Sequence, residues 1–387
     1  MNKYIILCFI LFSVSCTTDK VCRNPQGEAV DWYAIFFMPD SVSPDKKINY
    51  GYFDPNLPDL QFYKYSEDNF PPTMITKYVT EAGSNINFNY FFWNDDKSRK
   101  GGNKSSASES KAHAKGSLVY DEDDGVFLLH SLPKYPTRDL NNNVLNELPS
   151  NAGSNGQTFL CISVERKIAE QIAKLLNCIN VSVNKSIDSD KVSKSPNQWV
   201  NGLIKNRMDK SCSISHTVKI KSKGNEEFTF FGKNYKKIVI PYDTELREAY
   251  QDNVFVRTWS RPALAPALFD KYFLANVYEI KIGQYKYGVN TEHAKWAVTE
   301  TQEIVCFSDL NHTFSQDNRG GHIVCFKNKI LHNIMKAAII DSDIKRKNKN
   351  NNDAMDIDPN PNDSDDSMDI DQQHLVDLFR RKLNNVL

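Results

Sequence analysis

The chain has 387 residues, of which 48 are lysine or arginine and 48 are aspartate or glutamate, so its formal net charge is zero. With 40% hydrophobic and 25% charged residues the composition is typical of a globular protein, and the length suffices for two packed halves or one large domain. A neutral total neither supports nor excludes a nucleic-acid partner, because only a local basic patch would matter for one.

The N-terminus has the pattern of a secretory signal peptide. Lys3 supplies a positive charge, residues 4–14 are apolar, and Cys16 is small enough for a cleavage site. We therefore expect residues 1–16 to be removed. The alternatives are a buried N-terminal strand and a lipoprotein signal with Cys16 as the lipidated residue. The apolar run is too short to span a bilayer, and no later stretch reaches that length.

Secretion changes how the cysteines are interpreted. Six remain after the signal peptide: Cys22, Cys161, Cys178, Cys212, Cys306 and Cys325. An even number in an oxidising compartment predicts three disulfides, with free buried thiols as the alternative. No pair has the Cys-x-x-Cys spacing of a structural zinc site, so we expect no bound metal and no cofactor. Glycosylation sequons fit the same route and begin at Asn103, Asn180, Asn184, Asn311 and Asn362.

The first part of the mature chain predicts strands followed by a helix. Strand-like segments lie at residues 30–38, 85–93, 117–120, 126–130 and 158–163. Residues 166–176 carry apolar side chains at the spacing of one helix face. The polar stretch 94–112 reads as a loop.

The second part repeats this mixture. We expect strands at residues 227–231, 236–240, 276–282, 304–307 and 322–326, and helices at about 266–274 and 329–340. Pro266 would occupy the first turn of the earlier helix. Mixed strands and helices throughout predict an α/β fold class.

The composition changes near Asp341. Residues 350–371 contain eight aspartates and no lysine or arginine, which is too little apolar surface to support a core. We expect residues 342–387 to form a disordered acidic tail. The last sixteen residues have apolar side chains at helical spacing and could form a short helix that docks on the body or on a partner. The basic run 345–349 resembles a nuclear-import signal, a weak interpretation for a secreted chain.

A short motif occurs twice, as His113-Ala114-Lys115 and as His293-Ala294-Lys295. A strand-like stretch follows each copy, and a polar cluster comes 15 to 18 residues after it: His130-Ser131 in the first case and Asp309-Leu310-Asn311 in the second. On an extended segment the first and third positions point to the same side. Each copy would therefore project one imidazole and one ammonium group together.

Two such pairs facing each other suit phosphodiester cleavage. One imidazole attacks phosphorus and forms a phosphohistidine, while the other protonates the leaving oxygen and then activates water. The lysines stabilise the charge on the non-bridging oxygens, a task that Mg²⁺ performs in other enzymes. The chemistry requires one neutral and one protonated histidine, which favours an acidic optimum because an unperturbed histidine has a pKa of about 6.5.

At these residues the sequence resembles the deoxyribonuclease II family. The similar segments are HAKGSLVYDEDDGVFLLHSLPKYP (113–136), EHAKW (292–296), SDLN (308–311), RGGH (319–322), CRNPQGEAVDWYAIFFMP (22–39) and GQTFLCIS (156–163). Together they extend from about residue 22 to residue 341, with a weaker middle between 180 and 270. Linked motifs in one order are far more specific than a His-x-Lys alone.

The resemblance implies a phospholipase D-like fold, with two pseudo-symmetric α/β halves at 17–175 and 176–341 and the active site between them. It implies a secreted or lysosomal acid endonuclease that cuts double-stranded DNA to 3′-phosphate and 5′-hydroxyl ends without a metal. We expect the chain to be a monomer. The residues that match the family's catalytic motif positions are His113, Lys115, His293, Lys295, His130 and Asn311.

The resemblance also implies the disulfides Cys22–Cys161 and Cys306–Cys325, which leaves Cys178–Cys212 as our own inference for a third. If Asn311 lines the phosphate pocket, its sequon should carry no glycan. Asp309 could orient a catalytic histidine or simply cap a turn.

Some residues outside these motif positions have two interpretations. We expect Arg319 to be either structural or in contact with phosphate, and His312 and His322 to be incidental. The basic stretch 97–104 could contact DNA phosphates or be a solvated loop.

Two departures from the family pattern lie close to the second motif. Ser308 stands where the family usually has glycine, and His322 stands where a third glycine is usual. They leave open a second function, in which a secreted protein of weak or no activity keeps the fold and binds DNA or a host partner. A phosphodiesterase acting on lipid or another substrate is a third alternative.

Overall fold

The computed structural model describes residues 19–82, 87–96, 110–187, 198–259, 263–268 and 270–348. The expected signal peptide, the basic stretch 97–104 and residues 349–387 of the expected tail lie outside the described residues, so those expectations stay predictions. The expected tail begins too early at 342, because residues 342–348 are ordered: Ser342 ends the last strand, and the Asp343 carboxylate accepts the Asn276 N–H and the Tyr278 hydroxyl, both at 2.7 Å. Among the described residues, no helix is long and apolar enough to cross a bilayer.

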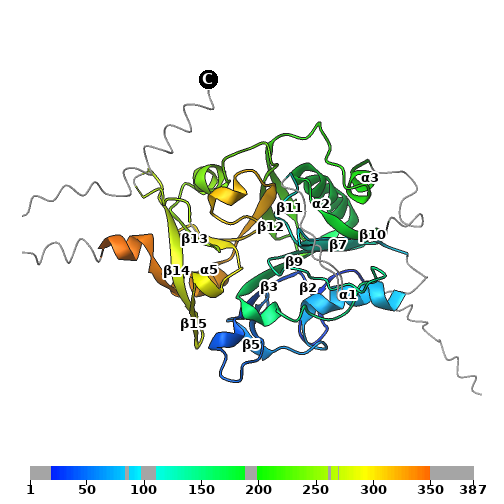
Figure 1. Cartoon of the computed structure of the whole chain (residues 1–387), viewed down its shortest axis with the longest axis horizontal. Helices are drawn as coiled ribbons and strands as arrows, with labels where there is room; N and C mark the ends of the chain where they lie inside the picture. Colours follow the sequence, from blue (N-terminus) through cyan, green and yellow to red (C-terminus); the bar gives the residue numbers. More distant parts are fainter. Residues whose placement is uncertain are drawn as a thin grey trace, which may run out of the picture.

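Two large sheets carry most of the mixed α/β structure (Figure 1). The first has eight antiparallel strands in the order β10 (Val183–Ile187), β6 (Asn89–Trp93), β7 (Gly116–Tyr120), β8 (Asp124–His130), β9 (Gln157–Glu165), β3 (Trp32–Met38), β4 (Asn49–Phe53) and β5 (Gln61–Lys64). The short strands β1 (Cys22–Arg23) and β2 (Ala29–Val30) pair beside it.

The second sheet has the order β11 (Ser215–Lys221), β12 (Glu227–Lys233), β18 (Gly321–Lys327), β17 (Ile304–Ser308), β16 (Trp296–Thr299), β13 (Val254–Arg257), β14 (Leu274–Ile282) and β15 (Tyr285–Gly288), with β19 (Ile339–Ser342) also paired to β14. Only the β13–β14 pair is parallel among these described strands. The helices are α1 (Pro71–Ala82), α2 (Arg166–Ile179), α3 (Gln198–Ile204), α4 (Arg247–Tyr250) and α5 (Lys329–Ala337).

The two sheets pack against each other through one shared core. Trp32 of the first sheet contacts Phe326 of the second at 4.7 Å between ring centroids, and Phe36 contacts Phe307 at 5.8 Å. Residues at alternate positions of β3 face this core, while those between them face a second apolar cluster on the outer side. Burial on both faces explains why residues 32–38 form a continuous apolar run rather than an alternating one.

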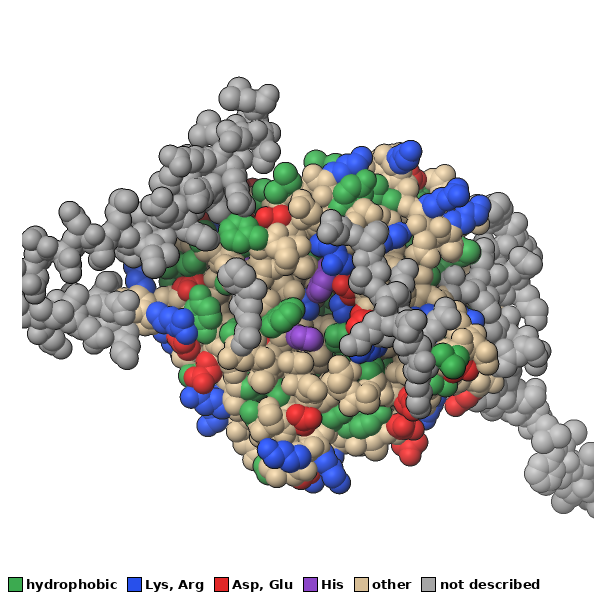
Figure 2. All heavy atoms as spheres, in the orientation of Figure 1, with side chains coloured by type: hydrophobic (Ala, Val, Ile, Leu, Met, Phe, Trp, Pro, Cys, Tyr) green, Lys and Arg blue, Asp and Glu red, His purple; other side chains and the backbone are tan. Residues whose placement is uncertain are grey.

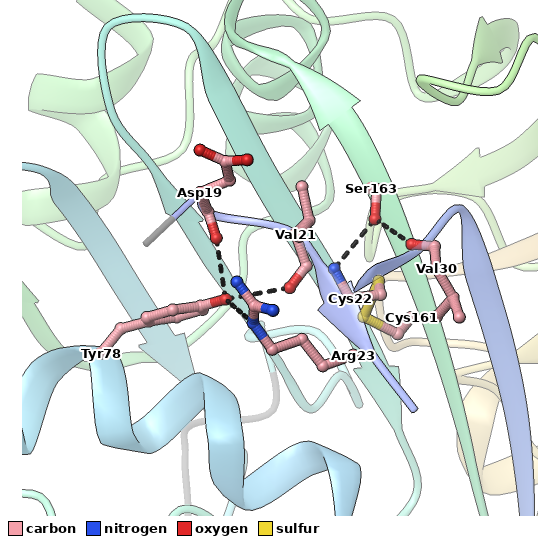
Figure 3. Close-up of a disulfide and its surroundings, with 8 residues drawn as sticks. All are labelled: Asp19, Val21, Cys22, Arg23, Val30, Tyr78, Cys161 and Ser163. Atoms are coloured by element: carbon pink, nitrogen blue, oxygen red, sulfur yellow. Dashed lines mark hydrogen bonds between the residues drawn. A yellow bond between two sulfur atoms is a disulfide. The ribbon is translucent and has the colours of Figure 1, made fainter. Parts of the chain in front are cut away.

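Three disulfides join the described cysteines in the pairs that we expected, namely Cys22–Cys161, Cys178–Cys212 and Cys306–Cys325. Figure 3 shows the first of them, which ties the N-terminal segment to β9. Beside it, the Ser163 hydroxyl accepts the Cys22 N–H at 2.9 Å and donates to the Val30 carbonyl at 2.7 Å. Tyr78 on α1 donates to the carbonyls of Asp19 and Val21 in the same segment.

Most of the strands and two of the helices that we expected are present, but two segments differ. Residues 236–240 form no strand, because the Asn234 side chain accepts the Lys236 N–H at 3.0 Å and opens a turn. Residues 266–274 form no helix. Instead, Ala267 and Leu274 exchange backbone hydrogen bonds at 3.0 and 3.1 Å, and Leu274 begins β14.

Candidate active site

The two His-x-Lys motifs occupy matching places in the two sheets. His113-Ala114-Lys115 precedes β7, and His293-Ala294-Lys295 precedes β16, each strand being inside its sheet. Figure 2 shows histidine side chains reaching the surface near the middle of one face, with basic and acidic side chains beside them.

Each motif is bonded to a glycine of the other sheet. The His113 N–H donates to the Gly320 carbonyl, just before β18, and the His293 N–H donates to the Gly156 carbonyl, just before β9, both at 2.9 Å. Neither glycine has room for a side chain. A Cβ added to Gly320 would lie 2.1 Å from the Ile179 carbonyl oxygen, and a Cβ added to Gly156 would lie 2.5 Å from a Glu292 carboxylate oxygen. These crossed hydrogen bonds bring the two motifs together where the sheets meet.

Around the first motif, three cationic or ionisable side chains share the carboxylate of Asp95, two residues beyond β6. Lys115 Nζ lies 2.5 Å from one oxygen, and Arg319 and His113 Nε2 lie 3.2 and 3.6 Å from the other. Burial alone would raise the pKa of Asp95, but Lys115, His113 and Arg319 together hold it well below its usual value. Asp95 is therefore an anion that orders the donors of this half of the site.

The contacts of His113 determine which ring nitrogen is free. Its Nδ1 lies 2.8 Å from the backbone carbonyl oxygen of Asp309, which can only accept, so Nδ1 carries a proton and Nε2 faces Asp95. Burial, and next the charge of Lys115, lower the pKa of His113 well below its ordinary value, while Asp95 opposes them. Lys295 of the other motif lowers it further, so the two motifs interact electrostatically.

The second motif has a different setting. The His293 ring lies against the indole of Trp259, with centroids 5.1 Å apart. Burial, followed by the charges of Lys295 and Lys115, lowers the pKa of His293 to about 4. Burial, followed by Lys115, lowers the pKa of Lys295 to about 7, and its ammonium donates to the His293 carbonyl at 2.8 Å.

A buried ion pair lies beneath this second motif. Arg257 Nε and a Glu292 carboxylate oxygen are 2.8 Å apart, and both side chains are fully buried. The other Glu292 oxygen accepts the Ala294 N–H at 3.0 Å. The pair therefore fixes the backbone at the centre of the motif.

Asp309 and Asn311 follow β17, at the end of the sheet where the second motif precedes the antiparallel strand β16. Both are buried, and one side-chain oxygen of each has no hydrogen-bond partner among the described residues. The other Asp309 oxygen accepts the His322 N–H at 3.1 Å. Burial raises the pKa of Asp309 to about 7, although Lys115 and Lys295 oppose the shift.

His130 lies beside Lys115, one strand further into the sheet. The backbone N–H of His130 donates to the Lys115 carbonyl at 3.1 Å, and the buried His130 ring packs against Phe159 and Tyr135. Burial, and then the charge of Lys115, lowers its pKa well below the ordinary value. His130 thus lies behind the motif lysine.

Two histidines that the sequence marked as incidental have specific partners. His312 is buried, with its ring nitrogens 2.8 Å from Asn276 Oδ1 and 3.0 Å from Asp243 Oδ1. His322 Nε2 lies 3.1 Å from Nε2 of the half-buried His216. The departure at Ser308 is also accommodated, since its hydroxyl bonds the His322 carbonyl at 3.0 Å.

Asp95, Trp259 and the Arg257–Glu292 pair were not identified from the sequence. A signal for the first two existed, since each stands two residues after an apolar strand that precedes a motif. Arg319 donates to the carbonyls of Lys111 and Ala112 as well as to Asp95, so it holds the segment leading into the first motif. Among the described residues, no group of three or more His, Cys, Asp or Glu side chains is arranged to hold a metal ion.

Sequence comparisons agree with the segments that first suggested a family. A family model described as Deoxyribonuclease II matches residues 21–343. Plancitoxin-1 of Acanthaster planci is 27% identical over 331 residues, covering 82% of this chain and 90% of the relative. Cell-death-related nuclease 7 of Caenorhabditis elegans is 25% identical, covering 88% and 92%. Deoxyribonuclease-2-alpha of Bos taurus is 23% identical, covering 79% and 85%.

Proposed function

The chain belongs to the deoxyribonuclease II family and is a deoxyribonuclease, and we propose that it hydrolyses DNA at acid pH, without a metal ion, through a phosphohistidine intermediate. The observation that carries this proposal is the crossed bonding of the two motifs to Gly320 and Gly156, which gathers two imidazoles and two ammonium groups into one site.

The proposed reaction has two steps. One motif histidine attacks phosphorus, and the P–O5′ bond breaks as the other histidine gives its proton to the leaving oxygen, which becomes the 5′-hydroxyl. The second histidine, now neutral, takes a proton from water as that water attacks the phosphohistidine, and the 3′-phosphate is released. Lys115 and Lys295 donate hydrogen bonds to the non-bridging oxygens throughout.

The charges of the site favour acidic conditions. With pKa values of about 7, Lys295 gains its positive charge and Asp309 loses its negative charge as the pH falls through neutrality. Both changes make the site more positive for an anionic phosphate. A bound phosphate also raises the pKa of nearby histidines, which supplies the protonated one that the reaction needs.

We assign supporting roles to His130 and Asn311. His130 lies behind Lys115 and orders the lysine backbone through its N–H. Asn311 is buried two residues after Asp309, which suits a residue that carries no glycan despite its sequon, and its amide N–H groups are donors of the kind that a phosphate oxygen accepts.

The strand orders of the two sheets support a phospholipase D-like pair of halves. The run β6-β7-β8-β9-β3 corresponds to β13-β16-β17-β18-β12, with the motif before the second strand of each run and a helix, α2 or α5, after the fourth. The Lys115 carbonyl accepts from His130 at 3.1 Å, and the Lys295 carbonyl accepts from Ser308 at 2.9 Å. We place the boundary after Ile187 rather than at 175, because β10 pairs with β6 of the first sheet.

The disulfides support an oxidising location, and we propose secretion or lysosomal delivery.

The seventh described histidine, His332, offers a control outside the motifs, since it lies on α5 and bonds the Thr299 carbonyl.

Plasmid nicking in EDTA between pH 4 and pH 8 tests the activity. We expect relaxed circles to form near pH 5, His113→Ala and His293→Ala to abolish them, and His332→Gln to keep them. Cleavage only with added Mg²⁺ would contradict the mechanism. DNA binding without cleavage by the unmodified protein would favour the alternative of an inactive binding protein.

A further inference from the structure

Trp259 is an exposed indole at the edge of the site. It stands two residues beyond β13, and its ring lies 5.1 Å from that of His293. Its relative exposure is 43%, whereas Trp32, Trp93 and Trp296 are each 1% exposed. An exposed tryptophan next to a reactive histidine calls for an explanation, because burying an indole is normally favourable.

Packing does not explain its position. Trp259 belongs to none of the three clusters of buried apolar side chains in the described structure. Its ring contacts that of His293, and the exposed part of the indole is available to a ligand.

The matching place in the first half carries a different kind of residue. Gly116 and Trp296 each follow the lysine of a motif, and their partners on the neighbouring strands are Trp93 and Arg257. Asp95 and Trp259 each stand two residues after that partner, so they occupy equivalent positions in the two halves. Asp95 bonds the lysine and approaches the histidine of its own motif. Trp259 offers its histidine no charge, so the carboxylate of the first half-site has no counterpart at this position of the second.

We propose that Trp259 stacks on a nucleobase next to the scissile phosphate. The idea rests on the proposed function, which places that phosphate between the two motif histidines. Every base presents an aromatic face, so such stacking tolerates any sequence. In an intact duplex the bases are stacked on one another, so the contact forms only where a nucleotide is unstacked. A duplex substrate must therefore unstack locally at the point of cutting.

Two oligonucleotides of one sequence test this directly. Both contain a single phosphodiester, and all their other linkages are uncharged methylphosphonates. The complete oligonucleotide carries every base, whereas the abasic oligonucleotide lacks the bases on either side of the phosphodiester. We expect Trp259→Leu to lower kcat/KM on the complete oligonucleotide about tenfold or more, chiefly through KM. On the abasic oligonucleotide the variant and the unmodified enzyme should be equal, and Trp259→Phe should recover most of the loss.

Ile238→Ala serves as the matched control, since Ile238 is 50% exposed and lies outside the site. An equal loss by Trp259→Leu on both oligonucleotides would mean that the indole acts through His293, and it would overturn the proposal. Full activity of Trp259→Leu on the complete oligonucleotide would overturn it as well.

A binding measurement separates this proposal from the proposed function. In His113→Ala, a single-stranded oligonucleotide should protect indole fluorescence from acrylamide quenching, and the protection should vanish when Trp259→Leu is added. If the unmodified protein cuts no DNA yet this protection is present, the proposed function fails and stacking stands. If it cuts DNA and Trp259 is not protected, stacking fails alone.

Discussion

Asp95 has an unusual place for a carboxylate in the site that we propose binds phosphate. It lies within hydrogen-bond reach of Lys115 and Arg319 and near His113, the donors that a phosphate would also attract. Because its pKa is held low, it stays an anion at any pH at which the protein works. Its effect is to keep these side chains in place before DNA arrives, so they need little reordering when a phosphate binds.

Asp309 differs from Asp95 in that its charge changes near neutrality. With a pKa raised to about 7 by burial, it is uncharged in acid and becomes an anion close to Lys115 and Lys295 above pH 7. We expect the activity of Asp309→Asn, in which this side chain stays neutral, to decline less steeply above pH 7 than that of the unmodified enzyme. Log(kcat/KM) should fall by about one unit less per pH unit between pH 7 and pH 9, because one titrating group is gone.

The measurement is cleavage of a fluorogenic oligonucleotide across that range at constant ionic strength. Asn keeps an oxygen for the His322 N–H, so the backbone contact of Asp309 is retained. Superimposable pH profiles for the two proteins would show that Asp309 does not limit activity.

The residues recognisable from the sequence were those within a short motif. His113 and Lys115 are two positions apart, and so are His293 and Lys295, so the repeat is visible along the chain. Asp95 reaches Arg319 across 224 positions, and nothing local indicates that pairing. Long-range partners depend on how the sheets meet, and a single sequence does not contain that information in readable form.

At the scale of elements, the crossed glycines couple the two sheets to the chemistry. We expect Gly320→Ala and Gly156→Ala each to lower kcat at least tenfold, because the new methyl group collides with backbone at Gly320 and with Glu292 at Gly156. Either collision shifts the carbonyl that holds the opposite motif. Single-turnover cleavage rates measure the effect.

Gly288→Ala is the matched control. Gly288 ends β15, a few residues before the second motif, and the nearest atom to its added Cβ would be the Tyr278 oxygen at an ordinary 3.5 Å. The control should keep full activity. If Gly320→Ala and Gly156→Ala kept it too, the crossed hydrogen bonds would not be needed to align the motifs.

Elements with strong periodicity were predictable, and those set by tertiary pairing were not. The apolar face expected over 166–176 appears as α2, with Ile172 and Leu176 buried. Pro266 suggested a helix start, but the pairing of Ala267 with Leu274 wins there. The strand β11 was missed because it is mostly polar and has a single buried residue, and its pairing with β12 is what defines it.

For the whole molecule, the disulfides differ in how much of the chain they constrain. Cys22–Cys161 spans 139 positions, and Cys306–Cys325 spans 19 positions between directly paired strands. Chain entropy predicts that removing the long link costs about 5 kcal/mol of unfolding free energy and removing the short one about 3 kcal/mol. Guanidinium unfolding of the two double Cys→Ala variants, followed by circular dichroism, measures the difference. A larger loss from the 306–325 pair would contradict this order.

The affinity of the whole molecule for DNA should depend on pH. In the free protein the pKa values of His113 and His293 are lowered, first by burial and then by the neighbouring lysines. A bound phosphate brings negative charge and raises the pKa of each nearby histidine, of Lys295 and of Asp309. The complex therefore holds more protons than its separate parts, and by linkage its affinity must increase as the pH falls.

We expect the dissociation constant of a non-cleaving His113→Asn variant for a fluorescent duplex to fall between pH 8 and pH 5, on the order of tenfold per pH unit for each proton taken up. Anisotropy at constant ionic strength measures it, and calorimetry in buffers of different ionisation enthalpy counts the protons. Because the pKa of Lys295 is about 7, Lys295→Met should flatten the pH dependence of the dissociation constant near pH 7. Non-specific contacts to other phosphates depend on salt, so they should not change with pH at constant ionic strength. An affinity that does not change with pH would mean that the phosphate is bound away from the motifs, because a phosphate among these groups cannot leave their protonation unchanged.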